Sequence, residues 1–151
     1  MVRKRTPWSI GMLTLFPEMF PGPLGFSLAG RALDEKLWNL NIYDIRRFCE
    51  KSAEVDSSPF GGGNGMVMRV DVIDRVLSAV TQDPNFAQLP VVYMTPRGRP
   101  LTQEKVKTFS QGEGAIILCG RYEGVDERAV AEWGMEEISV GDYVLSGGEP
   151  A

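Results

Sequence analysis

Three short segments of this sequence combine glycine with polar, aromatic or acidic residues, as ligand-binding loops do. They are residues 95–100 (TPRGRP), 120–124 (GRYEG) and 141–148 (GDYVLSGG). Glycine permits unusual backbone dihedral angles and lets main-chain N–H and C=O groups come close to a ligand. Each segment alone is better explained as an ordinary turn, but the three together predict a binding site.

The residues around these segments suit an adenosyl group. The sequence has neither a GxGxxG motif that opens a helix nor a GxxxxGK[ST] loop, so the usual dinucleotide and phosphate sites are not indicated. Main-chain groups in the glycine segments can pair with an adenine edge if apolar walls hold the ring. The side chains expected to form these walls are Tyr93, Met94, Val140 and Leu145.

Two tyrosines and two carboxylates in the segments are candidates for ligand contact. Tyr122 and Tyr143 lie among glycine and acidic residues, as rings that line a site do, although each alone is more often structural. A carboxylate such as Glu123 or Asp142 stabilises a nearby sulfonium, and beside a guanine it accepts the ring proton. Because the sequence contains no histidine, proton transfer falls to carboxylates, Tyr, Lys or Cys.

A fourth glycine-rich segment, residues 59–65 (PFGGGNG), ends a stretch from residue 46 that shows little periodicity. Long irregular stretches of this kind are typically functional or mobile. Closure of the segment over a bound base and a plain surface turn explain it about equally well. An anion-binding nest made by its glycines is a further alternative.

Hydrophobic periodicity predicts the elements that carry these segments. The predicted strands are residues 10–15, 39–42, 91–94, 115–119 and 137–140. The predicted helices are residues 24–37, 70–80, 102–109 and 126–133, and Pro17-Glu18 favours a helix start. This alternation indicates an α/β fold with a mainly parallel sheet and helices on both faces. The three glycine segments each follow the C-terminal end of a strand, at the edge where open α/β sheets bind ligands.

The composition indicates one domain, residues 1–151, without a general attraction for nucleic acid. A hydrophobic content of 43% is sufficient for one core. The formal net charge is −4, so any RNA contact must be local. The basic groups available are Arg3, Lys4, Arg5, Arg46, Arg47, Arg97, Arg99, Lys105 and Lys107, for which a solvated surface is an equal or better explanation.

The cysteines and the lack of long apolar runs suggest where the protein works. Cys49 and Cys119 have no CxxC spacing, which indicates neither a zinc site nor a disulfide framework, and no residue is assigned as a metal ligand. They fit a reducing compartment, so we expect a cytoplasmic protein. No apolar run reaches the roughly 18 residues of a membrane span, so we expect no membrane partner.

Five ordered blocks of the sequence, LTLFPEMF, PFGGGNGMVM, YMTPRGRPLTQ, ILCGRYEGVDER and EISVGDYVLSGGE, resemble the tRNA (guanine-N1)-methyltransferase family of the SPOUT class. This resemblance implies an α/β domain with a deep trefoil knot, an exception to the rule that chains are unknotted. It also implies an S-adenosylmethionine cofactor, a magnesium dependence, and a homodimer with active sites at the subunit interface. The implied reaction is methylation of the ring N1 of the guanine immediately 3′ of the anticodon in tRNA.

The resemblance also assigns roles to individual residues. Glu123 matches a carboxylate implicated in catalysis and in the magnesium dependence. The residues matching the loop near the target base are Pro59, Gly61, Gly62 and Gly63. The residues matching the cofactor loops are Tyr93, Met94, Pro96, Gly120, Tyr122, Gly124, Val140, Gly141, Asp142, Tyr143, Val144, Leu145, Gly147 and Gly148.

Two departures from the family pattern qualify these implications. Residues 50–58 are mostly acidic or small where the family has a basic, His-containing run. The family continues past the position of Ala151 through a knot-completing helix, a linker and a helical C-terminal domain. This further part carries the family's base, an Asp that approaches from the linker, and a supporting Arg. We therefore expect residues 1–151 alone to be catalytically silent. The alternatives are a non-catalytic dimeric SPOUT module that binds cofactor or RNA, and an unrelated α/β phosphate-binding domain.

Overall fold

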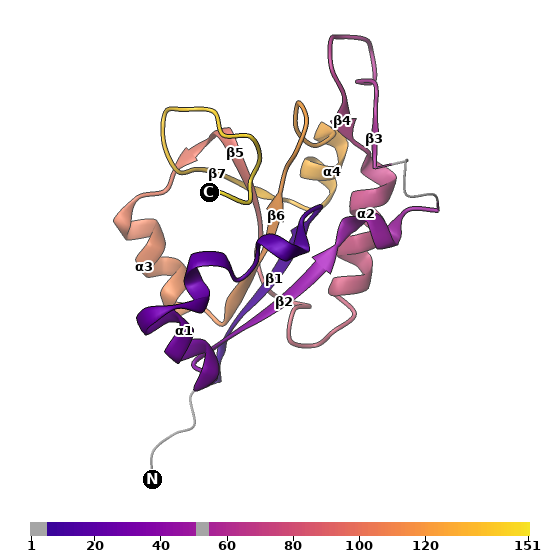
Figure 1. Ribbon diagram of the computed structural model, residues 1–151. Coiled ribbons are helices and arrows are strands. Elements are labelled where there is room, and N and C mark those ends of the chain that lie inside the picture. The colour runs from indigo at the N-terminus through magenta and orange to yellow at the C-terminus, as the bar shows by residue number, and fades with distance from the viewer. Residues whose placement is uncertain (1–5, 51–54) are drawn as a thin grey trace.

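A five-stranded parallel sheet in the order β2-β1-β6-β5-β7 forms the centre of this computed structural model, which describes residues 6–50 and 55–151 (Figure 1). A second sheet is the antiparallel pair β3-β4. The strands are β1 (Trp8–Thr14), β2 (Trp38–Asp44), β3 (Asp56–Ser57), β4 (Val67–Met68), β5 (Val91–Pro100), β6 (Gly114–Cys119) and β7 (Glu136–Ser139). The basic residues Arg3, Lys4 and Arg5 and residues 51–54 of the acidic stretch lie outside the described ranges.

Helices cover both faces of the large sheet, which confirms the predicted layering. The α-helices are α1 (Ser27–Asp34), α2 (Val70–Val80), α3 (Gln103–Gln111) and α4 (Glu127–Glu132), and the 3-10 helices are η1 (Pro17–Met19), η2 (Gly22–Gly25) and η3 (Ile45–Phe48). α2 and α4 lie on one face, and α1 and α3 on the other (Figure 1). In the described part of the chain, no helix is both long enough and apolar enough to span a bilayer.

Packing and two indole hydrogen bonds attach these helices to the sheet. The core under α2 joins Leu13, Tyr93 and Ile116 of the strands to the apolar side of the helix. On the other face, Trp8 Nε1 donates to the Phe109 carbonyl of α3 at 3.0 Å, and Trp38 Nε1 donates to the Ala29 carbonyl of α1 at 3.0 Å. Both faces of the sheet are therefore covered, as a parallel sheet requires.

The path of the chain at the carboxyl edge of the sheet brings the segment after β7 back to the end of β6. From β6 the chain runs through α4 to β7. In the sheet, β6 and β7 lie on opposite sides of β5. Residues after β7 return to the end of β6, where the Gly148 N–H donates to the Gly120 carbonyl at 2.9 Å. In Figure 1 this returning segment is the yellow loop above β5 and β7.

The helical stretch predicted over residues 24–37 was wrong in extent. Pro17-Glu18 does start a helix, but only the single turn η1, and the separate turn η2 precedes α1. Pro21 and Pro23, which precede the stretch, remove backbone donors between η1 and α1, and Phe26 is extended with φ −121° and ψ 166°, so α1 begins only at Ser27. The apolar side chains at helical spacing do not reach this chain's core, and Leu28 is 77% exposed.

Residues 46–64, predicted to be irregular, contain the helix η3 and the short strand β3. β3 pairs antiparallel with β4 through Asp56–Met68 and Ser57–Val67, with residues 58–66 between them. Strands of two residues carry too little alternation to be read from a sequence. In Figure 1 this hairpin extends away from the large sheet.

The segment 95–100, predicted to be a loop after a strand, belongs to β5. Its pairing with β7 shifts register, since both Met94 and Arg99 pair with Ile138 and the residues between them bulge. Gly98 lies against the β7 backbone, where an added Cβ would be 2.5 Å from the Ile138 nitrogen. The bulge therefore provides the loop-like wall that was expected, but within the strand.

Candidate functional site

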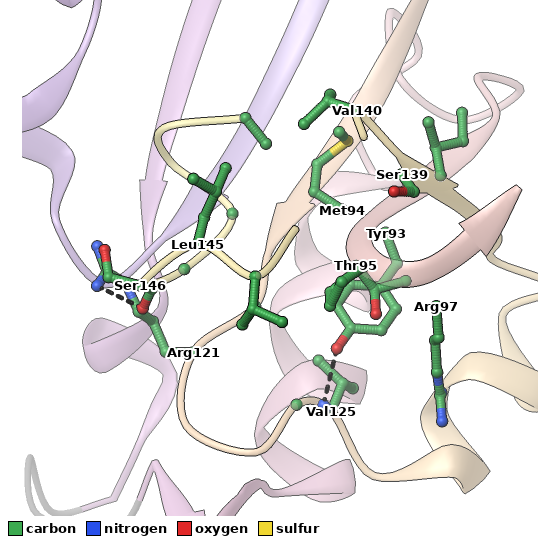
Figure 2. A pocket seen from close by; sticks show the side chains of 18 of the residues that line it. Tyr93, Met94, Thr95, Arg97, Arg121, Val125, Ser139, Val140, Leu145 and Ser146 are labelled. Atoms are coloured by element: carbon green, nitrogen blue, oxygen red, sulfur yellow. Dashed lines mark hydrogen bonds between the residues drawn. The ribbon is translucent and has the colours of Figure 1, made fainter. Parts of the chain in front are cut away.

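A cavity of about 330 Å³ opens at the carboxyl edge of the sheet (Figure 2). Its walls come from the end of β5, from the segment after β6 and from the segment after β7. Three separate stretches of the chain thus meet around one hollow. This is the place where ligands bind in open α/β sheets.

The structure brings most of the predicted site residues together here. Every residue assigned to the cofactor lines the cavity except Asp142, and Glu123 lines it as well. Pro59, Gly61, Gly62 and Gly63 are not part of the lining. Sequence reasoning missed Thr95, Arg97, Arg121, Val125, Ile138, Ser139, Ser146 and Ala151, most of which lie within or beside the three glycine segments, and that proximity was the available signal.

Tyr93 joins the first wall to the second. Its ring is buried, and its Oη accepts a hydrogen bond from the Val125 N–H at 3.2 Å (Figure 2). The ring also explains Gly120, because a Cβ at that position would lie 2.6 Å from the Tyr93 Cε2. Burial raises the pKa of the Tyr93 phenol, so the group remains a neutral hydrogen-bonding wall at neutral pH.

The second wall ends beside the glycine-rich hairpin. The Glu123 N–H donates to the Met66 carbonyl at 2.9 Å, and the Met68 N–H donates to the Gly124 carbonyl at 2.8 Å. Gly65 lies so close that a Cβ there would contact the Glu123 side chain. The base of the segment predicted to contact substrate therefore abuts the predicted catalytic carboxylate.

Tyr122, between these contacts, has a backbone conformation that L-residues rarely adopt. Its φ is 60°, which is uncommon outside glycine and is typical of residues held at functional sites. Burial, together with the neighbouring Asp56 carboxylate, raises the pKa of its phenol. The side chain thus stays neutral where it borders the cavity.

The third wall is a tight turn followed by an exposed apolar stretch. The Ser139 Oγ donates to the Gly141 carbonyl at 2.9 Å, and the Gly141 N–H donates to the same Oγ at 3.2 Å. The Tyr143 ring lies directly over Gly141, where a Cβ would collide with it. Val144 and Leu145 both line the cavity, and Val144 is 82% exposed.

Charged lining residues are mostly arginines engaged by carboxylates. Arg97 contacts Glu127 at 2.6 Å and Glu137 at 2.7 Å, and these hydrogen bonds raise the pKa of Arg97. Arg121 contacts Glu149 at 2.8 Å. Among the described lining residues, Glu123 is the one carboxylate. Cys119 is no candidate nucleophile, because burial raises the pKa of its thiol far above the ordinary range.

The arrangement defines a parallel α/β ligand-binding domain whose site is built from glycine-containing segments at the sheet edge. The family model described as tRNA (Guanine-1)-methyltransferase TrmD matches residues 8–151. The chain belongs to this family.

Individual relatives agree with the family match. The chain is 57% identical over 141 residues to a tRNA (guanine-N(1)-)-methyltransferase of Brucella ovis, and equally so to that of Brucella abortus strain S19. These alignments cover 93% of this chain and 56% of each relative, so the chain spans about half the length of the curated relatives it matches. The crystal structure of tRNA (m1G37) methyltransferase from Aquifex aeolicus is similar with a TM-score of 0.84 at 35% identity, covering 95% of this chain and 64% of that one.

We expect Tyr93 to contribute to alkaline unfolding. Unfolded tyrosines ionise near pH ~10, whereas folding raises the pKa of Tyr93 because the ring is buried. Its contribution to the free energy of unfolding is therefore fully present below about pH 10 and is lost as the pH rises towards the folded pKa. Urea unfolding at a series of pH values should show a shallower alkaline decline for Tyr93→Phe than for wild type.

The Tyr93→Phe variant also leaves the Val125 N–H without its partner, which lowers stability at every pH by about 1 kcal/mol. The two proteins are therefore compared by how steeply their free energy of unfolding falls with pH, and not by its absolute value. Parallel curves for the two proteins would contradict the prediction.

Proposed function

We propose that this chain is the cofactor-binding part of an S-adenosylmethionine-dependent methyltransferase that acts on the ring N1 of the guanine immediately 3′ of the tRNA anticodon. The convergence of three sequence-distant glycine segments on one cavity, lined by nearly all the residues matched to the family's cofactor loops, carries this proposal. Membership of the tRNA (guanine-N1)-methyltransferase family supports it.

The lining fits the cofactor. Apolar side chains of Met94, Val140 and Leu145 face the hollow beside main-chain groups, a combination suited to an adenine ring and its polar edge (Figure 2). When bound, S-adenosylmethionine supplies an electrophilic methyl group on a sulfonium. The chain's own task is to orient that group and to exclude water, which is what the walls around Tyr93 and Gly141 are placed to do.

Glu123 is the residue we assign to direct chemistry. It is the carboxylate among the described lining residues, and its backbone is fixed to Met66. A carboxylate beside a sulfonium is held in its charged form, which makes it a good electrostatic partner and a weak base. Glu123 therefore stabilises the cation, and removal of the guanine proton falls to a residue outside residues 1–151, as the family resemblance implies.

The hairpin between β3 and β4 is the surface we assign to tRNA. Its tip carries Phe60, which is 88% exposed, and an added Cβ at Gly61 or Gly62 would meet nothing within 4 Å. The Arg128 guanidinium lies 4.8 Å from the centre of the Phe60 ring, and an exposed aromatic ring beside a cation can stack on an unpaired base. Gly65, where the hairpin joins the rest of the fold, lies against Glu123. A nucleobase bound along this hairpin therefore lies beside the cavity.

The described residues do not form a site that fits magnesium. Within residues 6–50 and 55–151, no group of three or more His, Cys, Asp or Glu side chains is placed to hold a metal ion. We therefore derive no step through magnesium. We place the protein in the cytoplasm, where tRNA is modified and where the thiols of Cys49 and Cys119 remain reduced.

The cofactor proposal predicts unequal effects of valine at three glycines. In Gly120→Val and Gly141→Val the new side chain meets the rings of Tyr93 and Tyr143, which border the cavity, while at Gly112 an added Cβ has an ordinary 3.4 Å contact. Calorimetric titration with S-adenosylhomocysteine should show about tenfold weaker binding or worse for the first two, and less than about threefold for Gly112→Val. Equal losses at all three positions would mark the segments as structural turns, and binding of ATP in preference would contradict the cofactor assignment.

The activity itself is tested with labelled S-adenosylmethionine and two tRNA transcripts that differ only in having G or A immediately 3′ of the anticodon. The full-length protein should methylate the first transcript alone, and residues 1–151 should bind cofactor without turnover. Glu123→Gln in the full-length protein should reduce turnover by about 100-fold or more, whereas Glu132→Gln on the exposed side of α4 should not.

Two outcomes would overturn parts of the proposal. Comparable turnover by residues 1–151 would make Glu123 or Asp142 the base. Cofactor binding by a full-length protein that never methylates tRNA would favour the non-catalytic SPOUT module.

We also propose a homodimer. Large apolar side chains between η2 and the start of β2 are exposed, namely Leu24, Phe26, Leu28 and Leu37. Clustered exposure of this kind marks interaction surfaces. Sedimentation at micromolar concentration should give a dimer for wild type and for Val106→Asp on α3, and a monomer for Leu28→Asp; a monomeric wild type would exclude the shared active site.

A further inference from the structure

A buried charged cluster lies behind the third wall of the cavity. The Arg121 Nε is 2.8 Å from the Glu149 Oε2, and the Thr14 Oγ1 donates to the Glu149 Oε1 at 2.7 Å. The Glu149 side chain is fully buried, and the Arg121 side chain is 17% exposed. Neither Thr14 nor Glu149 lines the cavity.

The cluster connects three parts of the chain that the sequence keeps apart. Thr14 ends β1 and also accepts the Phe16 N–H at 2.9 Å. Arg121 follows β6, and one of its terminal nitrogens donates to the Ser146 carbonyl at 3.0 Å in the third cavity segment (Figure 2). The guanidinium also lies 4.4 Å from the centre of the Phe16 ring. At Gly147 the fit against this guanidinium leaves no room for a Cβ.

Burying these charges needs a reason other than stability. An isolated buried carboxylate is costly, so both Glu149 oxygens need partners, and Thr14 and Arg121 supply them. Even when fully paired, a buried ion pair contributes little to stability compared with apolar side chains of the same volume. What the cluster does provide is a fixed position for the returning segment, because its hydrogen bonds hold Glu149 and Ser146 relative to β1 and to the end of β6.

We propose that Thr14, Arg121 and Glu149 are positioning residues that hold segment 141–148 in place as the third wall of the cofactor cavity. The inference rests on the proposed function for the identity of the cofactor. It predicts that changes outside the cavity lining weaken cofactor binding by loosening this wall.

The test uses Thr14→Val and Glu149→Gln in the full-length protein. We expect the affinity for S-adenosylhomocysteine to fall about tenfold in both, since Thr14→Val removes the hydroxyl that donates to Glu149, and Glu149→Gln removes the charge that faces Arg121 and one of the two acceptor oxygens. Amide hydrogen exchange at Gly148, whose N–H is bonded to the Gly120 carbonyl, should become faster without any ligand present. In turnover assays, the KM for S-adenosylmethionine should rise while kcat stays near the wild-type value.

Two variants serve as controls. Thr14→Ser keeps the hydroxyl and should retain wild-type affinity. Arg75→Gln removes an ion pair with Asp71 on α2, far from the cluster in the fold, and should change neither affinity nor exchange at Gly148.

Unchanged affinity and unchanged Gly148 exchange in folded Thr14→Val would overturn the inference. If Glu149→Gln fails to fold, Thr14→Val and its serine counterpart decide the question. If the wild type binds no S-adenosylhomocysteine, the proposed function fails, and Gly148 exchange still decides whether the cluster holds the segment.

Discussion

The close return of the chain from β7 to the end of β6 is the constraint on which the cavity depends. The backbones of Gly148 and Gly120 approach within one hydrogen bond of 2.9 Å. A Cβ at Gly148 would be 2.6 Å from the Cys119 Cα, and one at Gly120 would be 2.6 Å from the Tyr93 ring. Without these two glycines the returning segment would be displaced from β5 and β6, and the hollow between the three walls would lose its shape.

The buried polar side chains around this return are paired by hydrogen bonds. Across residues 6–50 and 55–151, no buried side-chain nitrogen or oxygen lacks a hydrogen-bond partner. The Tyr93 Oη accepts from Val125, the Ser139 Oγ bonds Gly141, and Glu149 is shared by Thr14 and Arg121. The first bond joins two walls, the second lies within one wall, and the bonds of Glu149 tie the returning segment to β1 and to the segment after β6. The cavity is therefore pre-shaped by the protein, which lowers the ordering cost of binding a flexible ligand.

The same edge joins the cavity to the hairpin that we propose as the tRNA surface. Backbone bonds between Glu123 and Met66, and between Gly124 and Met68, attach the β3-β4 hairpin to the second wall. The carboxylate of Glu123 thus lies at the junction of a hollow that fits a small molecule and an open loop that suits an unpaired base. A methyl transfer between two bound molecules requires such a junction, because both reactants must be held within reaction distance.

The sequence by itself determined the five strands of the large sheet and the three glycine segments, because hydrophobic periodicity and glycine content are local properties. The parallel α/β sheet with helices on both faces followed from these. Only the tertiary structure decided that segment 95–100 is a bulge in β5, that Leu28 points away from the core, and that Asp142 stays outside the cavity lining. The contact between Thr14 and Glu149 likewise joins residues 135 positions apart. Contacts of this kind depend on how the whole chain packs, so no local pattern encodes them.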